Sequence, residues 1–266
     1  MKDRDVIKPS FYSIFAGVFF TILSVIILFL LQSGLGSGNL FYIFAFVIFL
    51  GNYFISYFFT GITAFLVYDY FKDGDATMSE AWAATKKNIL TIFYLAIISA
   101  VVNVILGILR GRTRRDRGVG GGLSGMIIGF IEKAWTVATY FMIPAIVIED
   151  RDLKSAFERA SSIIKNNLLP IGVGEIAVGI VTAFLSAFGI AIAILIGISL
   201  LSVTGPLLAI LVAGILIVII IALSMYVTTA YHTCLFLWAR NIEDAKVGMP
   251  GTIKPPAPIA GALGIA

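Results

Sequence analysis

The chain has too few charged residues for a water-soluble protein. Asp, Glu, Lys and Arg together make up 13% of its 266 residues, whereas a soluble domain carries about 25%. Hydrophobic residues account for 59%, and the mean hydropathy is +1.02. This shortage of charge excludes a single soluble domain and indicates an integral membrane protein.

Residues and motifs that carry chemistry are also scarce. Cys234 is the single cysteine and His232 the single histidine, so the sequence offers neither an internal disulfide nor enough ligands for a metal site. It contains no HExxH, GxSxG or GxxxxGKS/T motif, and the glycine-rich GVGGGLSG lacks the lysine of a phosphate-binding loop. We therefore expect a protein that is not an enzyme and that holds no metal and no cofactor.

Long apolar runs predict six transmembrane helices, because about 18 apolar residues are enough to cross a bilayer. The spans are Phe11 to Leu31, Leu40 to Tyr68, Ile89 to Leu109, one within Leu123 to Ile148 and two within Leu168 to Trp238. The last run would measure roughly 100 Å as a single helix, so we divide it at SVTGP, from Ser202 to Pro206. The predicted fold is all-α: a polytopic membrane helical bundle over residues 1–242, followed by a tail over 243–266 that is rich in Pro, Gly and Ala.

The fourth span is the least regular, because it contains Glu132 and Lys133. A charge near the bilayer centre costs about 2.5–3.5 kcal/mol on insertion scales. Leu123 to Ile131 could therefore be a shallow or re-entrant segment, with Lys133 reaching back to the interface. A full, tilted helix that faces a protein interior fits the same residues.

The distribution of Lys and Arg predicts the orientation of the chain. Of the 19 such residues, 13 lie in the N-terminus, the second-to-third connection, the fourth-to-fifth connection and the C-terminus. The side with more Lys and Arg is the cytoplasmic side. We therefore expect both termini in the cytoplasm and the chain in the plasma membrane of a prokaryote.

The connection between the third and fourth spans runs against this distribution. Five arginines stand in residues 110–122: Arg110, Arg112, Arg114, Arg115 and Arg117. They could dock an acidic partner or anionic headgroups, since guanidinium groups bind carboxylate and phosphate in bidentate fashion. The segment could instead be a disordered, solvated turn, because it is rich in glycine and charge. Nucleic acid is not an expected partner, since no aromatic residue stands among the arginines.

The chain contains an internal repeat. AFLVYDYFKDGDATMSEAW, from Ala64, and AIVIEDRDLKSAF, from Ala145, each end an apolar span, turn acidic and lead through a polar segment to an Asn and the next span. CLFLWARN, from Cys234, resembles the end of such a span a third time. The six spans are therefore predicted to form three two-helix units that share one orientation.

The two polar segments between these spans are predicted to be amphipathic interfacial helices. In the first, Thr77 and Glu80 have the spacing of a capping box. In the second, apolar residues recur at intervals of three and four: Leu153, Ala156, Phe157, Ala160 and Ile164. Such a helix suits the membrane interface, although an extension of the next transmembrane helix fits the pattern as well.

Three ionisable residues lie within the apolar spans: Glu132, Lys133 and Glu175. Intramembrane charges are functional candidates. Adjacent helical residues diverge by about 100°, so Glu132 and Lys133 cannot pair closely with each other. Lys133 could meet Glu175 from the fifth span, either for a proton or ion step or simply to hold two helices together.

Small residues recur at every fourth position in two spans. They are Gly121, Gly125 and Gly129 in the fourth span, and Gly189, Ala193 and Gly197 in the fifth. This spacing lets helix backbones approach closely. It predicts either close packing within the chain or a face for self-association.

The stretch GFIEKAWTVATYFMIPAIVIEDRDLKSAFERASSIIKNNLLP, from Gly129, resembles the core of a family of uncharacterised six-span bacterial and archaeal membrane proteins, a domain of unknown function. The positions that carry the resemblance are Ala134, Trp135, Thr139, Tyr140, Phe141, Pro144, Glu149 and Ser161. It extends loosely from Phe11 to about Asn241, and it implies the six-span fold but no activity. The arginine-rich segment departs from the family pattern, in which a shorter and less basic connection is expected.

These observations lead to two hypotheses. The first is a scaffold or accessory subunit that acts by association with itself or with another membrane protein, in contact with membrane lipids. The alternative is a small channel or transporter with a path between the three two-helix units. Polar residues that face one another within the spans are sparse in the sequence, which argues against a membrane-embedded enzyme.

Overall fold

The computed structural model describes residues 5–32, 38–115 and 119–248 of the chain. Every regular element in these ranges is a helix. The elements are η1 (Asp5–Ile7), α1 (Lys8–Gln32), α2 (Gly38–Asp73), α3 (Met78–Lys87), α4 (Ile89–Arg115), α5 (Val119–Val147), α6 (Leu153–Asn166), α7 (Leu168–Thr204) and α8 (Pro206–Gly248).

Six of these helices are long and apolar enough to cross a membrane: α1, α2, α4, α5, α7 and α8. The division of the last apolar run is confirmed, because α7 ends at Thr204 and Gly205 turns the chain with φ of 79°. Glycine adopts this left-handed conformation without steric cost, and Pro206 suits the first position of the next helix. The chain is therefore a polytopic, all-helical membrane protein.

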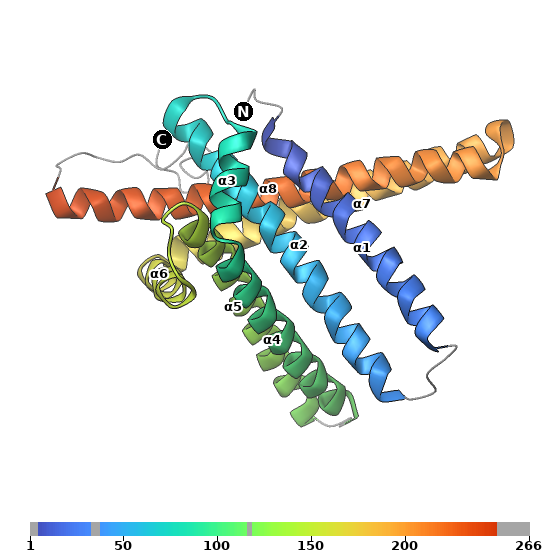
Figure 1. The fold of residues 1–266 in the computed structure, drawn as a ribbon, viewed down its shortest axis with the longest axis horizontal. Helices are drawn as coiled ribbons and strands as arrows, with labels where there is room; N and C mark the ends of the chain where they lie inside the picture. The colour runs from blue at the N-terminus through green and yellow to red at the C-terminus, as the bar shows by residue number, and fades with distance from the viewer. Residues whose placement is uncertain (1–4, 33–37, 116–118, 249–266) are drawn as a thin grey trace.

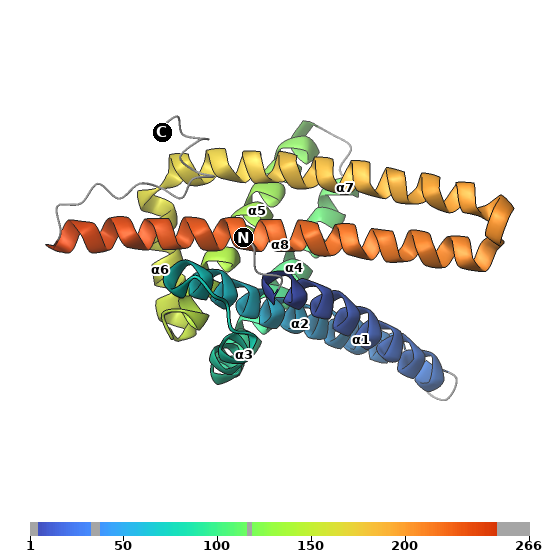
Figure 2. The same ribbon diagram turned by 90° about the horizontal axis from the view of Figure 1, so that it is seen from above.

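The six long helices form two groups that cross at a wide angle. In Figure 1, α1, α2, α4 and α5 run in one general direction, while α7 and α8 lie side by side across them. Figure 2 shows the same pair from above, with α7 and α8 antiparallel and side by side, and with the end of α8 extending beyond the beginning of α7. Between the groups, α8 makes most of the contacts, because it packs against α1, α2 and α5.

The apolar core lies where the two groups meet, next to α6. Its largest fully buried side chains are Phe141, Met142, Ile163, Leu235 and Phe236. A smaller cluster joins η1, α2 and α3 around Ile62 and Leu66. Elsewhere the long helices expose many large apolar side chains, as expected for surfaces that contact lipid tails.

The fourth span is a complete helix. α5 runs without a break from Val119 to Val147, through Glu132, Lys133 and Pro144. The alternative of a re-entrant segment before Glu132 is therefore wrong. The helix tolerates both charges because each has a partner on a neighbouring helix: Arg110 for Glu132 and Glu175 for Lys133.

The arginine-rich segment is helical over residues 110–115 and 119–122, so the alternative of a disordered turn does not hold for these residues. α4 continues to Arg115, and α5 begins at Val119. Arginine has a high helix propensity, and the extended α4 brings Arg110 to Glu132 of the antiparallel α5. The side chains of Arg112, Arg114 and Arg115, and the whole of Arg117, lie outside the described residues.

The two stripes of small residues have different surroundings. A Cβ atom at Gly189 would lie 2.8 Å from Ile220, and one at Gly197 would lie 2.9 Å from Ala213. Ala193, between them, is 1% exposed. This stripe therefore serves the close packing of α7 on α8. On α5, by contrast, a Cβ atom at Gly125 or Gly129 would meet nothing within 4 Å, and the surroundings of Gly121 lie outside the described residues.

The beginning of α3 is held differently from the predicted capping box. Thr77 is the N-cap residue, but its side chain makes no capping hydrogen bond. Its backbone N–H donates to Asp69 Oδ2 at 3.0 Å instead of to Glu80. Asp69 lies near the end of α2 and is 5% exposed. A buried carboxylate forms a stronger bond to a backbone N–H than an exposed side chain that must reach back.

α6 is a separate helix and not an extension of α7, because the chain turns at Asn167. Its buried residues are Ala156, Ala160 and Ile163, so the buried face differs from the predicted one. Phe157 is 47% exposed. The small residues allow α6 to approach α5 closely, and Phe157 lies about 100° from Ala156 around the helix and faces outward.

The connection from α5 to α6 is tied to the end of α3. Asp150 has a positive φ of 56°. Its carboxylate accepts a hydrogen bond from Lys87 Nζ at 2.5 Å and one from Asn88 Nδ2 at 2.9 Å. Both bonds lower the pKa of Asp150, and the bond from Lys87 has the larger effect.

At the other end of the chain, α8 continues to Gly248, beyond residue 243 where the tail was predicted to begin. Residues 249–266 lie outside the described ranges.

Candidate functional site

Two adjoining cavities lie among the membrane-spanning helices. The first, which we call the hydroxyl cavity, lies between α2, α5, α7 and α8 and has a volume of about 370 Å³. The second, the adjoining cavity, lies between α2, α4 and α5 and has a volume of about 250 Å³. Ser56, Thr60 and Tyr140 line both. The two cavities therefore meet at these three residues, where the two groups of helices cross.

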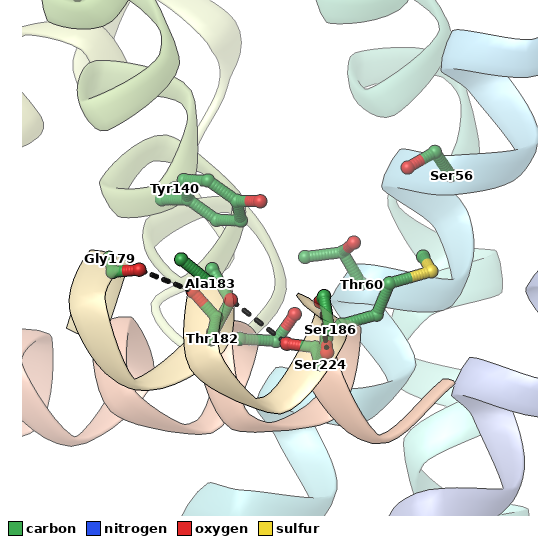
Figure 3. Close-up of a pocket in the computed structure, with 11 residues that line it drawn as sticks. Ser56, Thr60, Tyr140, Gly179, Thr182, Ala183, Ser186 and Ser224 are labelled. Atoms are coloured by element: carbon green, nitrogen blue, oxygen red, sulfur yellow. Dashed lines mark hydrogen bonds between the residues drawn. The ribbon is translucent and has the colours of Figure 1, made fainter. Parts of the chain in front are cut away.

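Hydroxyl groups dominate the wall of the hydroxyl cavity (Figure 3). Eight of its 11 lining residues carry one: Ser56, Thr60, Tyr140, Thr182, Ser186, Ser224, Thr228 and Thr229. None of the 11 residues is charged. Figure 3 shows the hydroxyls of α7 and α8 on one side of the space, with Tyr140 of α5 and Thr60 of α2 across from them. Four helices thus contribute polar groups to one cavity.

Three of the eight hydroxyl protons of this wall are used in hydrogen bonds inside the protein. Thr182 donates to the carbonyl of Val178 at 2.7 Å, and Thr228 donates to the carbonyl of Ser224 at 2.9 Å. The hydroxyls of Ser186 and Ser224 bond to each other at 2.9 Å. A hydroxyl that donates its proton still has lone pairs with which to accept. At Thr182 and Thr228 the wall therefore presents acceptors, which fit a ligand that donates hydrogen bonds.

Three ionisable residues from three helices meet beside the hydroxyl cavity. Lys133 Nζ of α5 lies 2.8 Å from Glu175 Oε2 of α7. Glu175 Oε1 in turn bonds Nε2 of His232 on α8. The side chain of His232 is 2% exposed and that of Glu175 10%, whereas that of Lys133 is 62% exposed. The predicted meeting of Lys133 and Glu175 is confirmed, and His232 is a third member that the sequence did not indicate.

His232 connects this ionisable cluster to the cavity wall. Its ring stacks on Tyr140, with a centroid distance of 4.3 Å and an interplanar angle of 10°. Its Nδ1 lies 2.7 Å from the carbonyl oxygen of Thr228. Tyr140 and Thr228 both line the hydroxyl cavity. The imidazole of His232 is therefore in direct contact with two residues of the wall.

Glu132 does not belong to this cluster. It lines the adjoining cavity and pairs with Arg110 of α4. Trp135, which also lines that cavity, donates from Nε1 to Ser99 Oγ at 3.1 Å. As predicted, Glu132 and Lys133 have different partners. Arg110 thus finds an acidic group within its own chain.

A second charge cluster lies where α6 meets the end of α8. Arg159 Nε lies 3.2 Å from Glu149 Oε2, and Arg159 Nη1 pairs with Glu243 of α8. Arg151 adds a contact to Glu149 at 2.5 Å. Burial opposes the charge on Arg159, but the carboxylates of Glu243 and Glu149 outweigh this and raise its pKa. The cluster fastens α6 to α8, and none of its residues lines either cavity.

The sequence contains a pattern that indicates the hydroxyl wall. The pattern is visible only when the spans are compared with one another. Polar residues four positions apart recur in four spans: Ser56 and Thr60, Thr136 and Tyr140, Thr182 and Ser186, and Ser224, Thr228 and His232. Residues four apart share a helix face. Polar residues that face one another within the spans looked sparse in the sequence, and the structure instead brings the four faces together at one place.

One comparison with known proteins gives a match. The model of a family of unknown function, DUF6159, matches residues 39–245. The matched residues include every lining residue of both cavities and the whole ionisable cluster. No curated protein and no solved structure matches the chain.

Proposed function

The chain belongs to DUF6159, a family of unknown function, and from its cavities we propose that it binds a small, uncharged, hydroxyl-rich solute within the bilayer and passes it across the membrane. The observation that carries this proposal is the pair of polar cavities that meet at Ser56, Thr60 and Tyr140 between the two groups of helices. Polar groups within a bilayer are costly unless they are paired. A wall of eight hydroxyls among membrane-spanning helices is better explained by a polar ligand than by packing.

The chemistry of the wall restricts the solute. A volume of about 370 Å³ lies near the lower end of the ~300–1,000 Å³ range of small-molecule sites. An isolated charge would be strongly destabilised in a cavity without a counter-charge, and none of the lining residues is charged. The lone pairs of Thr182 and Thr228 favour hydrogen-bond donors. Polyols combine these properties: they are small, neutral and rich in hydroxyl donors.

The proposal extends to the arrangement of the chain in the membrane. The packing of α1 on α2, of α4 on α5 and of α7 on α8 supports three two-helix units. The placement of most Lys and Arg near α3, α6 and the two chain ends supports cytoplasmic termini in a plasma membrane. The one-sided burial of α6 supports an amphipathic helix at the interface. The protein is proposed to release the solute unchanged, without acting as an enzyme.

Reconstituted protein should accelerate the entry of polyols into liposomes. The full chain would be placed in proteoliposomes, which are then mixed with an excess of glycerol, erythritol or xylitol. Swelling after the first osmotic shrinkage is followed by light scattering and compared with that of protein-free liposomes. We expect faster swelling with at least one polyol, because the hydroxyl cavity replaces the hydration of its hydroxyl groups. Swelling rates equal to those of protein-free liposomes for all three polyols would contradict the proposal.

Association is a second candidate function, and the open glycines of α5 favour it. The stripe on α7 is already filled by α8, whereas Gly125 and Gly129 meet nothing within 4 Å. Met126 and Phe130 beside them are 73% and 75% exposed. A face with small residues at an interval of four suits a second helix. This face fits another copy of the chain, or a different membrane protein.

Substituting both open glycines by leucine should reduce self-association. The double variant Gly125→Leu, Gly129→Leu removes the shallow groove that a second helix would enter, so it is expected to run as a monomer where the unaltered chain forms an oligomer. Native mass spectrometry from mild detergent measures this difference. Gly172→Leu is the matched control, because Gly172 on α7 is also open. A monomer for the unaltered chain, or an oligomer for the double variant, would remove this face from consideration.

A further inference from the structure

The contacts of His232 favour one tautomer of its ring. Nδ1 lies 2.7 Å from the carbonyl oxygen of Thr228, and a carbonyl can only accept a hydrogen bond. A hydrogen bond between these two atoms therefore requires a hydrogen on Nδ1. On the other side of the ring, Nε2 faces Oε1 of Glu175. A hydrogen bond between these two atoms requires one proton, which belongs either to the imidazole or to the carboxyl group.

Each protonation state of the Glu175–His232 pair has one favourable and one unfavourable feature. With the proton present, the Nε2–Oε1 hydrogen bond is made, but Lys133, Glu175 and His232 together carry one net positive charge. Without it, Lys133 and Glu175 form a neutral pair, but a lone pair of His232 faces a carboxylate. A net charge and an unmade polar contact are both costly at low dielectric. Neither state satisfies both conditions, so the site is suited to gain and lose a proton.

Three titratable side chains lie next to the Glu175–His232 pair. Lys133 and Tyr140 face it from α5, and Tyr231 adds a ring from α8 at a centroid distance of 5.4 Å from His232. Of these groups only Lys133 brings a charge, and its exposed side chain gives the cluster contact with the surroundings. Without the shared proton, Glu175 keeps its ion pair with Lys133 and loses its hydrogen bond to His232. The imidazole is stacked on Tyr140, which lines both cavities.

From this geometry we infer that the Glu175–His232 pair is a protonation site that couples proton movement to the passage of solute through the hydroxyl cavity. The inference rests on the proposed function for its solute. One proton is taken up between Nε2 and Oε1 when the cavity is in one state and released when it is in the other. No bond of the solute is broken. Tyr140, at the junction of the two cavities, is the positioning residue that responds to the protonation of the pair.

The protonation site can be tested without any solute, because the chain contains a single histidine. Protein labelled with 15N-histidine, in lipid nanodiscs, gives imidazole signals that belong to His232 alone. Nδ1 is expected to carry a hydrogen throughout a titration, while the Nε2 shift changes once as the shared proton leaves. Glu175→Gln should move or remove that change. An Nδ1 without hydrogen, or an Nε2 shift that does not change with pH, would overturn the inference even if the variant did not fold.

The coupling is tested in proteoliposomes that contain a trapped pH-sensitive dye. The three polyols are used in two ways: as labelled solute at equal concentration on both sides, which reports exchange, and as an inward gradient, which drives net entry. We expect the gradient to change the internal pH with the unaltered chain. Glu175→Gln and His232→Gln should retain exchange and lose the pH change. Glu80→Gln, the same substitution at an exposed carboxylate of α3, should behave like the unaltered chain.

The possible failures are separable. If the unaltered chain exchanges a polyol but the internal pH stays constant, the proton link is overturned and the proposed function stands. If the pH change persists in both variants, the Glu175–His232 pair is not the coupling site. If no polyol exchanges, the proposed function fails for this class of solute, and the titration of His232 alone decides whether a protonation site exists.

Discussion

Replacing Gly179 with tryptophan should abolish polyol flux and leave the protein folded. Gly179 lines the hydroxyl cavity, and a Cβ atom added there meets nothing within 4 Å. The indole ring can therefore enter the cavity without a clash at the backbone of α7. It occupies space that the solute needs, and it covers acceptor groups of the wall with apolar surface. The swelling assay with proteoliposomes measures the effect, and the expected rate is that of protein-free liposomes.

Gly172→Trp is the matched control for this substitution. Gly172 lies on the same helix, two turns earlier, and is equally open, but it lines neither cavity. Its tryptophan is expected to face the surroundings and to leave the flux at the level of the unaltered chain. Equal flux in the two tryptophan variants would place the solute path somewhere other than the hydroxyl cavity.

Replacing Arg159 with alanine should give the largest loss of stability among the charged residues outside the spans. Its side chain is 14% exposed and pairs with both Glu149 and Glu243. Removing one partner of a buried ion pair costs ~3–5 kcal/mol, because the other charge remains without a partner. Glu149 keeps Arg151, and Glu243 is 30% exposed, so we expect a smaller loss of about 1–3 kcal/mol. Thermal unfolding in detergent, followed by tryptophan fluorescence, measures it.

The contribution of Arg159 should not vary with pH in the physiological range. Its pKa is raised in the folded protein by Glu243 and Glu149. A base with a raised pKa contributes its full stability below the pKa of the unfolded state, and for arginine that value lies far above neutrality. Lys154→Ala is the control on the same helix, because Lys154 is 86% exposed and 3.9 Å from Glu158. If the two alanine variants unfolded at the same temperature, Arg159 would not fasten α6 to α8.

The prediction from sequence succeeded where one helix determines the outcome. Apolar runs alone placed the six spans, and a glycine followed by a proline, Gly205 and Pro206, placed the turn between α7 and α8. The pairing of Lys133 with Glu175 was also predictable, because an intramembrane charge requires a partner and few were available. These inferences need no knowledge of how the helices cross.

The prediction failed where the outcome depends on the angle between helices. Thr182 and Ser224 lie on helices that cross α2 and α5 obliquely, and the sequence does not encode that angle in any local pattern. For the same reason the sequence did not indicate His232 as the partner of Glu175. The cap of α3 failed differently, since Asp69 is eight residues before Thr77 and lies outside the spacing of a capping box.

The length of α7 makes the bilayer itself a determinant of the cavity. With 37 residues, α7 is about 55 Å long, whereas the hydrocarbon core of a bilayer is ~30 Å thick. A helix that is too long for its bilayer tilts until its apolar length fits. α7 and α8 pack against each other and form one wall of the hydroxyl cavity. We therefore expect a thicker membrane to reduce the tilt of α7 and α8 from the bilayer normal and to change their angle to α2 and α5. The length of the lipid chains then sets the width of the space in which the solute is held.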